Sequence, residues 1–139
     1  MPKQASNYLR HPRVWQFVLA CYWAILFVAT HRATIPRVLP GRGSDKLAHV
    51  SAFAVLAAIF AITWQLSSGR LIVRHLCWIW VVVAIYGALD EWTQIAVGRN
   101  ASARDWAADA IGAALGLLLF HWLQRSRRRR SLINSADSS

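Results

Sequence analysis

Acidic residues are scarce in this chain: only 6 of its 139 residues are Asp or Glu, against 16 Lys or Arg, giving a net charge of +10. Cysteine is rarer still, and both copies, Cys21 and Cys77, lie inside apolar runs. Such thiols pack as small apolar side chains, so we predict neither a disulfide nor a metal thiolate. With 56% hydrophobic residues and 8 Trp, the composition excludes an ordinary soluble domain.

Long apolar runs are the main feature of the sequence. A helix needs roughly 20 mostly apolar residues to cross a bilayer core about 30 Å thick. Four runs meet this need, and we expect spans at about 14–30, 46–66, 71–89 and 105–123. The sequence therefore predicts an all-α fold, a polytopic bundle of four transmembrane helices. We assign residues 1–125 to this single domain and 126–139 to a basic, disordered C-terminal tail.

The first apolar run could also be read as a cleaved signal peptide, because basic residues precede it. A signal core spans about 7 to 15 residues and ends in a small-residue cleavage site. The run from Val14 to Thr30 is longer, and Ala29-Thr30-His31-Arg32 resembles such a site poorly. We expect an uncleaved span.

The basic residues lie between and beyond the apolar runs rather than along one helix face. This pattern indicates lipid phosphate as the partner and argues against nucleic acid. Counting Lys and Arg beside each span places both termini in the cytoplasm. Anionic lipids are expected to bind a C-terminal arginine cluster, namely Arg125, Arg127, Arg128, Arg129 and Arg130.

Nearly all the acidic residues gather at span ends that face the same, non-cytoplasmic side, because only Asp137 lies elsewhere. The first and third loops share this side, since an even number of crossings separates them. We therefore predict one ligand-binding face. Its candidates are Asp45, Lys46, His49, Asp90, Glu91, Gln94, Arg99, Arg104, Asp105 and Asp109.

Helical spacing sharpens the prediction for the last span. Asp105, Asp109, Gly112 and Gly116 share one face of that helix at about 100° per residue. Ala108, Gly112 and Gly116 are small residues four apart, a pattern that lets a neighbouring helix approach closely in lipid. A carboxylate below the headgroups would cost up to a few kcal/mol if it faced acyl chains. Asp109 therefore needs a partner within the protein, for which Lys46, His49, Arg99 and Arg104 are the candidates.

Two pieces of this face resemble the VanZ-like family of small bacterial membrane proteins. The first is Asp45-Lys46-Leu47-Ala48-His49, and the second runs from Asp90-Glu91-Trp92-Thr93-Gln94 through Gly98-Arg99 to Asp105, Asp109, Gly112 and Gly116. Val97 stands where the family often has Pro, and Asp109 where many members have Asn. The resemblance implies a cell-envelope protein of the bacterial cytoplasmic (inner) membrane, since founding members are tied to teicoplanin-type glycopeptide resistance. It implies no particular reaction.

Purely structural interpretations of these residues stay open beside the functional ones. Ser102 and Asp105 match a helix capping box, and His49 could be a hydrogen-bonded histidine of the bundle interior. The whole acidic set could be a salt-bridge scaffold that orients the helices. We predict no cofactor and no metal, because no tight spacing such as His-Glu-x-x-His occurs and the neighbouring Lys and Arg would repel a cation.

Three functions remain in competition. The one we favour is a non-catalytic envelope factor that binds an anionic lipid-linked or glycopeptide-type group through Lys46, Arg99 and Arg104. The second is an intramembrane enzyme on lipid-linked envelope intermediates, with His49, Glu91 or Asp90 as catalytic candidates. The third is a small proton-coupled transporter in which Asp109 and His49 titrate, and four spans would then require an oligomer.

Overall fold

The computed structural model describes residues 11–31 and 44–136. Four long helices make up these ranges: α2 (Pro12–Thr30), α3 (Ser44–Ser68), α4 (Val73–Gln94) and α5 (Ala103–Ala136). One short 3-10 helix, η1 (Ile95–Val97), follows α4, and the described ranges contain no strand. Each long helix is long and apolar enough to cross a membrane. The predicted all-α architecture with four membrane-spanning helices is confirmed.

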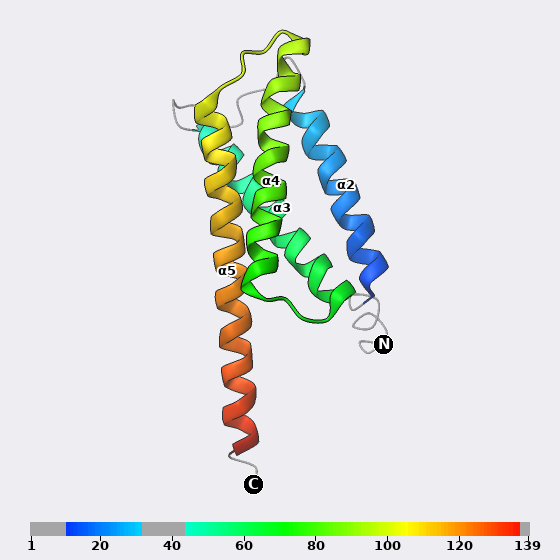
Figure 1. Ribbon diagram of the computed structural model, residues 1–139, viewed down its shortest axis with the longest axis vertical. Coiled ribbons are helices and arrows are strands. Elements are labelled where there is room, and N and C mark those ends of the chain that lie inside the picture. Colours follow the sequence, from blue (N-terminus) through cyan, green and yellow to red (C-terminus); the bar gives the residue numbers. More distant parts are fainter. Residues whose placement is uncertain (1–10, 32–43, 137–139) are drawn as a thin grey trace.

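The helices run alternately up and down, so that α2 begins and α5 ends at the same end of the bundle (Figure 1). Pro12 opens α2, where its missing N–H costs nothing because the first turn has no internal acceptor. The core lies where α3, α4 and α5 meet, and Leu26 of α2 belongs to it. Its largest apolar members are Phe53, Leu56, Ile79 and Val83, all at most 1% exposed.

Close packing of α3 against α5 organises the bundle. A Cβ atom added to Gly112 would overlap the backbone of Val50, and one added to Gly116 would overlap the backbone of Ala54. The two helices therefore touch backbone to backbone, an arrangement that small residues permit in lipid. Ala108, the third member of the small-residue series, is buried beside them.

Side chains also bond one helix to the backbone of the next. Trp80 of α4 donates its indole N–H to the carbonyl oxygen of Ala110 in α5 at 2.9 Å, and Trp106 of α5 donates to Ala84 of α4 at 3.0 Å. Tyr22 of α2 donates its hydroxyl to the carbonyl of Ala52 in α3 at 2.9 Å. These bonds satisfy polar groups that have no water to turn to within a bilayer.

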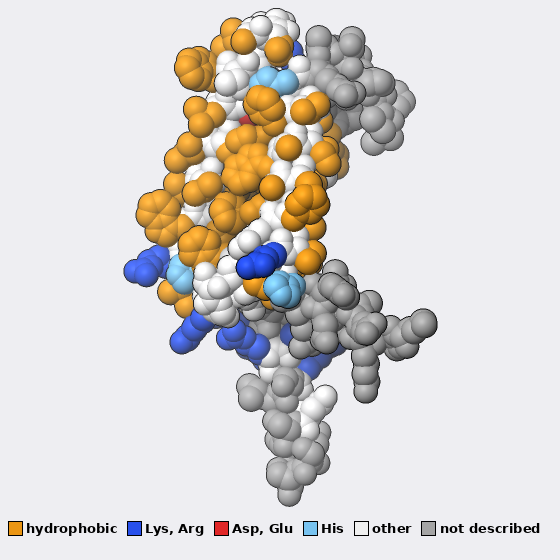
Figure 2. Space-filling model, turned by 90° about the vertical axis from the view of Figure 1, so that its right-hand side faces the viewer, with side chains coloured by type: hydrophobic (Ala, Val, Ile, Leu, Met, Phe, Trp, Pro, Cys, Tyr) orange, Lys and Arg blue, Asp and Glu red, His pale blue; other side chains and the backbone are white. Residues whose placement is uncertain are grey.

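The outer surface of the bundle is apolar. Large side chains such as Phe17, Trp78, Leu118 and Trp122 are each at least 60% exposed. Figure 2 shows hydrophobic side chains over the middle of the molecule and Lys and Arg side chains gathered at its lower end. This distribution matches a protein whose sides face acyl chains and whose basic end meets headgroups.

Two helix ends differ from the prediction. Helix α4 continues through Asp90 and Glu91 to Gln94, although we expected the span to end at about residue 89 and a loop to begin at Asp90. The polar residues stay helical because they are buried, and Gln94 donates its amide N–H to Asp90, one turn earlier, at 2.9 Å. Gly98, with φ +78°, then turns the chain away after η1.

Helix α5 likewise runs beyond its expected end at about residue 123. It reaches Ala136, so residues 126–136 are helical and not the disordered tail that we predicted. No Gly or Pro interrupts this stretch, and arginine is a strong helix former. The rest of the predicted tail, residues 137–139, lies outside the described residues.

Candidate functional site

The polar residues gather at one end of the bundle, where α2 and α4 finish and α3 and α5 begin; we call it the polar end (Figure 1). Asp90, Glu91, Asp105 and Asp109 all belong to this end. Asp45 lies in the first turn of α3, but its side chain is outside the described part of the chain.

Asp90 is the centre of one hydrogen-bond network. Its side chain is almost fully buried and accepts hydrogen bonds from Thr30 Oγ1 at 3.0 Å, Gln94 Nε2 at 2.9 Å and the Tyr86 hydroxyl at 3.4 Å. His31 Nδ1 lies 3.6 Å from the same carboxylate. Both carboxylate oxygens are thereby engaged, which makes Asp90 a link between α2 and α4.

Arg99 fastens the loop after α4 to the end of α2. Its Nη1 donates to the carbonyl oxygen of Thr30 at 2.7 Å. A cation is favourable there because the carbonyls at a helix C-terminus carry the negative end of the helix dipole. His31 adds a second link, since its Nε2 lies 2.9 Å from Thr93 Oγ1.

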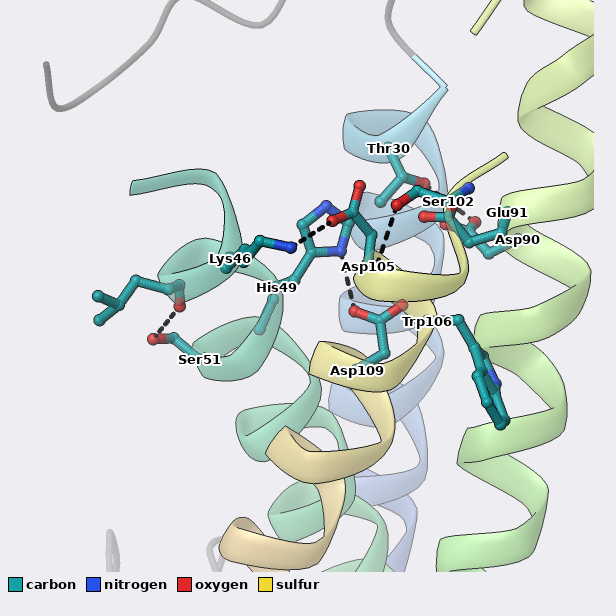
Figure 3. Close-up of polar contacts among 12 residues, drawn as sticks. Thr30, Lys46, His49, Ser51, Asp90, Glu91, Ser102, Asp105, Trp106 and Asp109 are labelled. Atoms are coloured by element: carbon teal, nitrogen blue, oxygen red, sulfur yellow. Dashed lines mark hydrogen bonds and ion pairs between the residues drawn. The ribbon is translucent and has the colours of Figure 1, made fainter. Parts of the chain in front are cut away.

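Glu91 holds the start of α5. Its Oε2 accepts the backbone N–H of Ser102 at 2.7 Å, while Ser102 Oγ accepts the N–H of Asp105 at 3.2 Å (Figure 3). The second of these bonds realises the capping pattern that Ser102 and Asp105 predicted. Asp105 also forms an ion pair with Lys46 of α3, at 3.7 Å. The start of α5 is thus tied to both α3 and α4.

Asp109 is the most deeply placed carboxylate, one turn further into the bundle and 1% exposed. Its Oδ1 lies 2.9 Å from His49 Nδ1, whereas its Oδ2 is buried and has no hydrogen-bond partner among the described residues. The absence of a side chain at Gly87 makes room for this group, because a Cβ there would stand 3.3 Å from Asp109 Oδ2. Figure 3 shows the His49 and Asp109 side chains reaching toward each other from α3 and α5.

Of the four partners suggested for Asp109, His49 is the one that the structure brings to it. Lys46 reaches Asp105 instead, and Arg99 reaches a carbonyl. Arg104 is exposed and forms no ion pair with any residue in the described ranges. Asp90, Glu91 and Asp109 are thus buried inside the bundle, whereas Asp105, Lys46 and Arg104 lie nearer its surface.

Thr30, His31 and Tyr86 contribute to this end without having been singled out from the sequence. All three lie at Asp90. A signal existed for two of them: Thr30 and His31 are polar residues directly at the end of the first apolar run. Tyr86 stands one turn before Asp90, a spacing that places both on one helix face.

Comparison with known proteins gives one match. A family model described as VanZ/LLP1 matches residues 6–124, which is most of the chain. No curated protein and no solved structure matches it.

Proposed function

The chain belongs to the VanZ/LLP1 family, and from that premise we propose that this multi-pass membrane protein binds an anionic, lipid-linked envelope ligand at its polar end. We place the polar end on the non-cytoplasmic side of the bacterial cytoplasmic membrane. The C-terminal arginines then lie in the cytoplasm and bind anionic lipids, in keeping with the positive-inside rule.

The observation that carries the proposal is that cationic side chains at the polar end are more exposed to solvent than its buried carboxylates. The Lys46 side chain is 48% exposed and Arg104 is exposed as well, while Asp90, Glu91 and Asp109 are at most 5% exposed. A ligand that approaches the polar end from outside therefore meets positive charge first. Phosphate or carboxylate groups form their strongest hydrogen bonds with such cationic donors.

Lys46 is available for this role although it has an ion pair. At 3.7 Å and with a half-exposed ammonium group, its contact with Asp105 contributes roughly 0 to 1 kcal/mol. A multivalent phosphate can replace this contact at little cost. Arg99 plays a different part, because its bond to the Thr30 carbonyl makes it a positioning residue that holds the loop beside the donors.

Binding to purified full-length protein in nanodiscs tests the proposal. The probe is a polyprenyl pyrophosphate, with the uncharged polyprenol of the same length as the ligand control. Lys46→Gln and Arg104→Gln should each weaken binding about tenfold, since a hydrogen bond to a charged group contributes about 1.5 to 3 kcal/mol. The matched control is Arg74→Gln, which removes an exposed charge from the opposite end.

Equal binding of the charged and uncharged lipids would contradict the proposal, as would equal losses in all three variants. A cellular arm compares glycopeptide susceptibility of strains that carry the same variants. If strains with Lys46→Gln or Arg104→Gln keep their protection at normal protein level, any role in resistance does not depend on this ligand face.

A second candidate function rests on the His49–Asp109 pair. A histidine whose ring nitrogen is held at 2.9 Å by a buried carboxylate has the arrangement of a general base and the group that orients it. An intramembrane enzyme acting on lipid-linked envelope intermediates would use it. Product formation from the polyprenyl pyrophosphate by purified protein, lost in His49→Ala and retained in Arg74→Gln, would favour this function over simple binding.

A further inference from the structure

Three helices bring potential metal ligands together just below the polar end. His49 of α3, Glu91 of α4 and Asp109 of α5 each offer one ligand atom, and these atoms all lie within 4.8 Å of one another. Glu91 and Asp109 are buried and His49 is largely so. Figure 3 shows the side chains of His49 and Asp109 meeting in the space between their helices.

The free oxygen of Asp109 is the second observation that points to a ligand. Asp109 Oδ2 is buried without a hydrogen-bond partner in the described part of the chain. A buried polar atom of this kind is rare in native proteins and costly, all the more in a segment that lies within a bilayer. A bound cation would satisfy it.

The charges around the cluster agree with this interpretation. Glu91 and Asp109 place two carboxyl groups close together, and no Lys or Arg among the described residues forms an ion pair with either. Two cationic side chains of the polar end, Lys46 and Arg99, contact Asp105 and the Thr30 carbonyl instead. The sequence-based objection, that neighbouring Lys and Arg would repel a cation, therefore does not apply to this cluster. The spacing rule also fails here, because it searches one helix and these three ligands come from three helices.

We propose that His49, Glu91 and Asp109 form a binding site for one divalent cation of the Zn²⁺ or Mn²⁺ class. A set of one imidazole and two carboxylates suits these ions, because imidazole favours Zn²⁺ and carboxylate favours Mn²⁺. Three protein ligands leave at least one coordination position for water or for an oxygen of a bound molecule. The inference stands independently of the anionic ligand proposed above, since it concerns the affinity of the protein itself.

A surface groove lies beside the cluster at Glu91. It has a volume of about 270 Å³ and lies between the end of α4 and the start of α5. Glu91, Ser102 and Trp106 are among the residues that line it. Glu91 thus faces this groove and belongs to the ligand cluster as well.

Metal binding to the full-length protein in detergent tests the site. After treatment with a chelator, the protein is titrated with ZnCl₂ and separately with MnCl₂, by calorimetry and by elemental analysis of the desalted complex. We expect one equivalent of metal per chain. Asp109→Asn and Glu91→Gln should weaken binding at least about tenfold, the lower end of the loss seen when even an outer partner of a metal site is removed.

His121→Gln is the matched control, because it removes a potential metal ligand from the same helix about three turns beyond Asp109. It should bind metal as the unchanged protein does. Retention of full affinity in Asp109→Asn would overturn the proposal, as would binding of less than a tenth of an equivalent by the unchanged protein.

A second measurement decides the matter if the carboxylate variants fail to fold. Mn²⁺ bound to the unchanged protein should show electron–nuclear coupling to an imidazole nitrogen, and ¹⁵N-histidine labelling should alter it. A bound Mn²⁺ without such coupling overturns the site. So does an infrared band of a protonated carboxylic acid that persists at saturating metal, because the two carboxyl groups would then be sharing a proton instead.

Discussion

Single residues at the polar end differ in whether they hold the bundle or face a ligand. Asp90 belongs to the first kind, because it accepts hydrogen bonds from Thr30, Tyr86 and Gln94 and is 2% exposed. Lys46 belongs to the second, being half exposed and held by one long ion pair. Loss of function at these two positions would therefore have different causes.

Replacing Asp90 by Asn should destabilise the protein. The new amide group would point N–H donors at Thr30 or Gln94, which already donate, so buried donors would lose their acceptor. The expected cost is about 1 to 3 kcal/mol, measured by reversible unfolding in mixed micelles. Asp105→Asn serves as control and should cost less, since its side chain is 20% exposed; equal losses would contradict the assignment of Asp90 as a structural link.

The sequence predicted which residues lie at this end but not how they pair. Helical spacing gives the direction of Asp109, but it does not identify the neighbour that a second helix supplies, and His49 is 60 residues away along the chain. Thr30 and His31 stand at the end of an apolar run, but their contacts with Asp90 cross the bundle and leave no local sequence pattern. Pairings of this kind follow from helix rotation, which apolar runs leave undetermined.

At the scale of helices, the close contact between α3 and α5 determines how the bundle packs. Helices α3 and α5 touch through their backbones at Gly112 and Gly116, and the small-residue spacing in the sequence had indicated a close approach of this sort. What the spacing did not indicate is which helix approaches. That depends on the positions of Val50 and Ala54, which carry no special sequence signal.

Gly112→Ala should weaken the bundle at this contact. The added methyl group would meet the backbone of Val50, which cannot rotate away as a side chain would. Overpacking typically costs about 1 to 3 kcal/mol, again measured by unfolding in mixed micelles. Leu118→Ala on the lipid-facing side of the same helix, 64% exposed, should change stability by only about 0.5 kcal/mol. A larger effect at Leu118 than at Gly112 would rule out the backbone contact.

Helix ends were the least predictable part of the fold. Polar side chains at residues 90–94 suggested a loop, yet burial and mutual hydrogen bonds keep them helical. The basic stretch after Leu123 suggested disorder, yet it lacks any residue that would end a helix before Ala136. In both places charge or polarity predicts a helix boundary, although neither breaks a helix by itself.

The far end of α5 should contribute little to the stability of the bundle. Arg129, Arg130, Ile133 and Asn134 are all exposed. Deletion of residues 129–139 is therefore expected to change the unfolding free energy by no more than about 0.5 kcal/mol, while the helical circular dichroism signal per chain decreases. A large loss of stability would show that this end of α5 packs against the rest of the chain.

The whole molecule has two unlike ends: one holds the buried carboxylates, and the other carries the arginines seen in Figure 2. The side of the membrane on which each end lies can be measured by cysteine labelling of a variant in which Cys21 and Cys77 are replaced by Ala. In this background Asn100→Cys, between α4 and α5, should react with an impermeant maleimide on intact spheroplasts. Ser68→Cys, at the last residue of α3 and at the opposite end, should react only after permeabilisation. The reverse result would place both termini outside.

The backbone contact between α3 and α5 has a further consequence for how this protein can evolve. At Gly112 and Gly116 the space that a side chain would need is taken by another main chain, so no compensating substitution nearby can restore it. At Leu115, Leu118 and Leu119, on the exposed side, almost any apolar residue would serve equally well. Neutral drift along α5 should therefore follow a four-residue rhythm, with fixed positions separated by freely exchangeable ones.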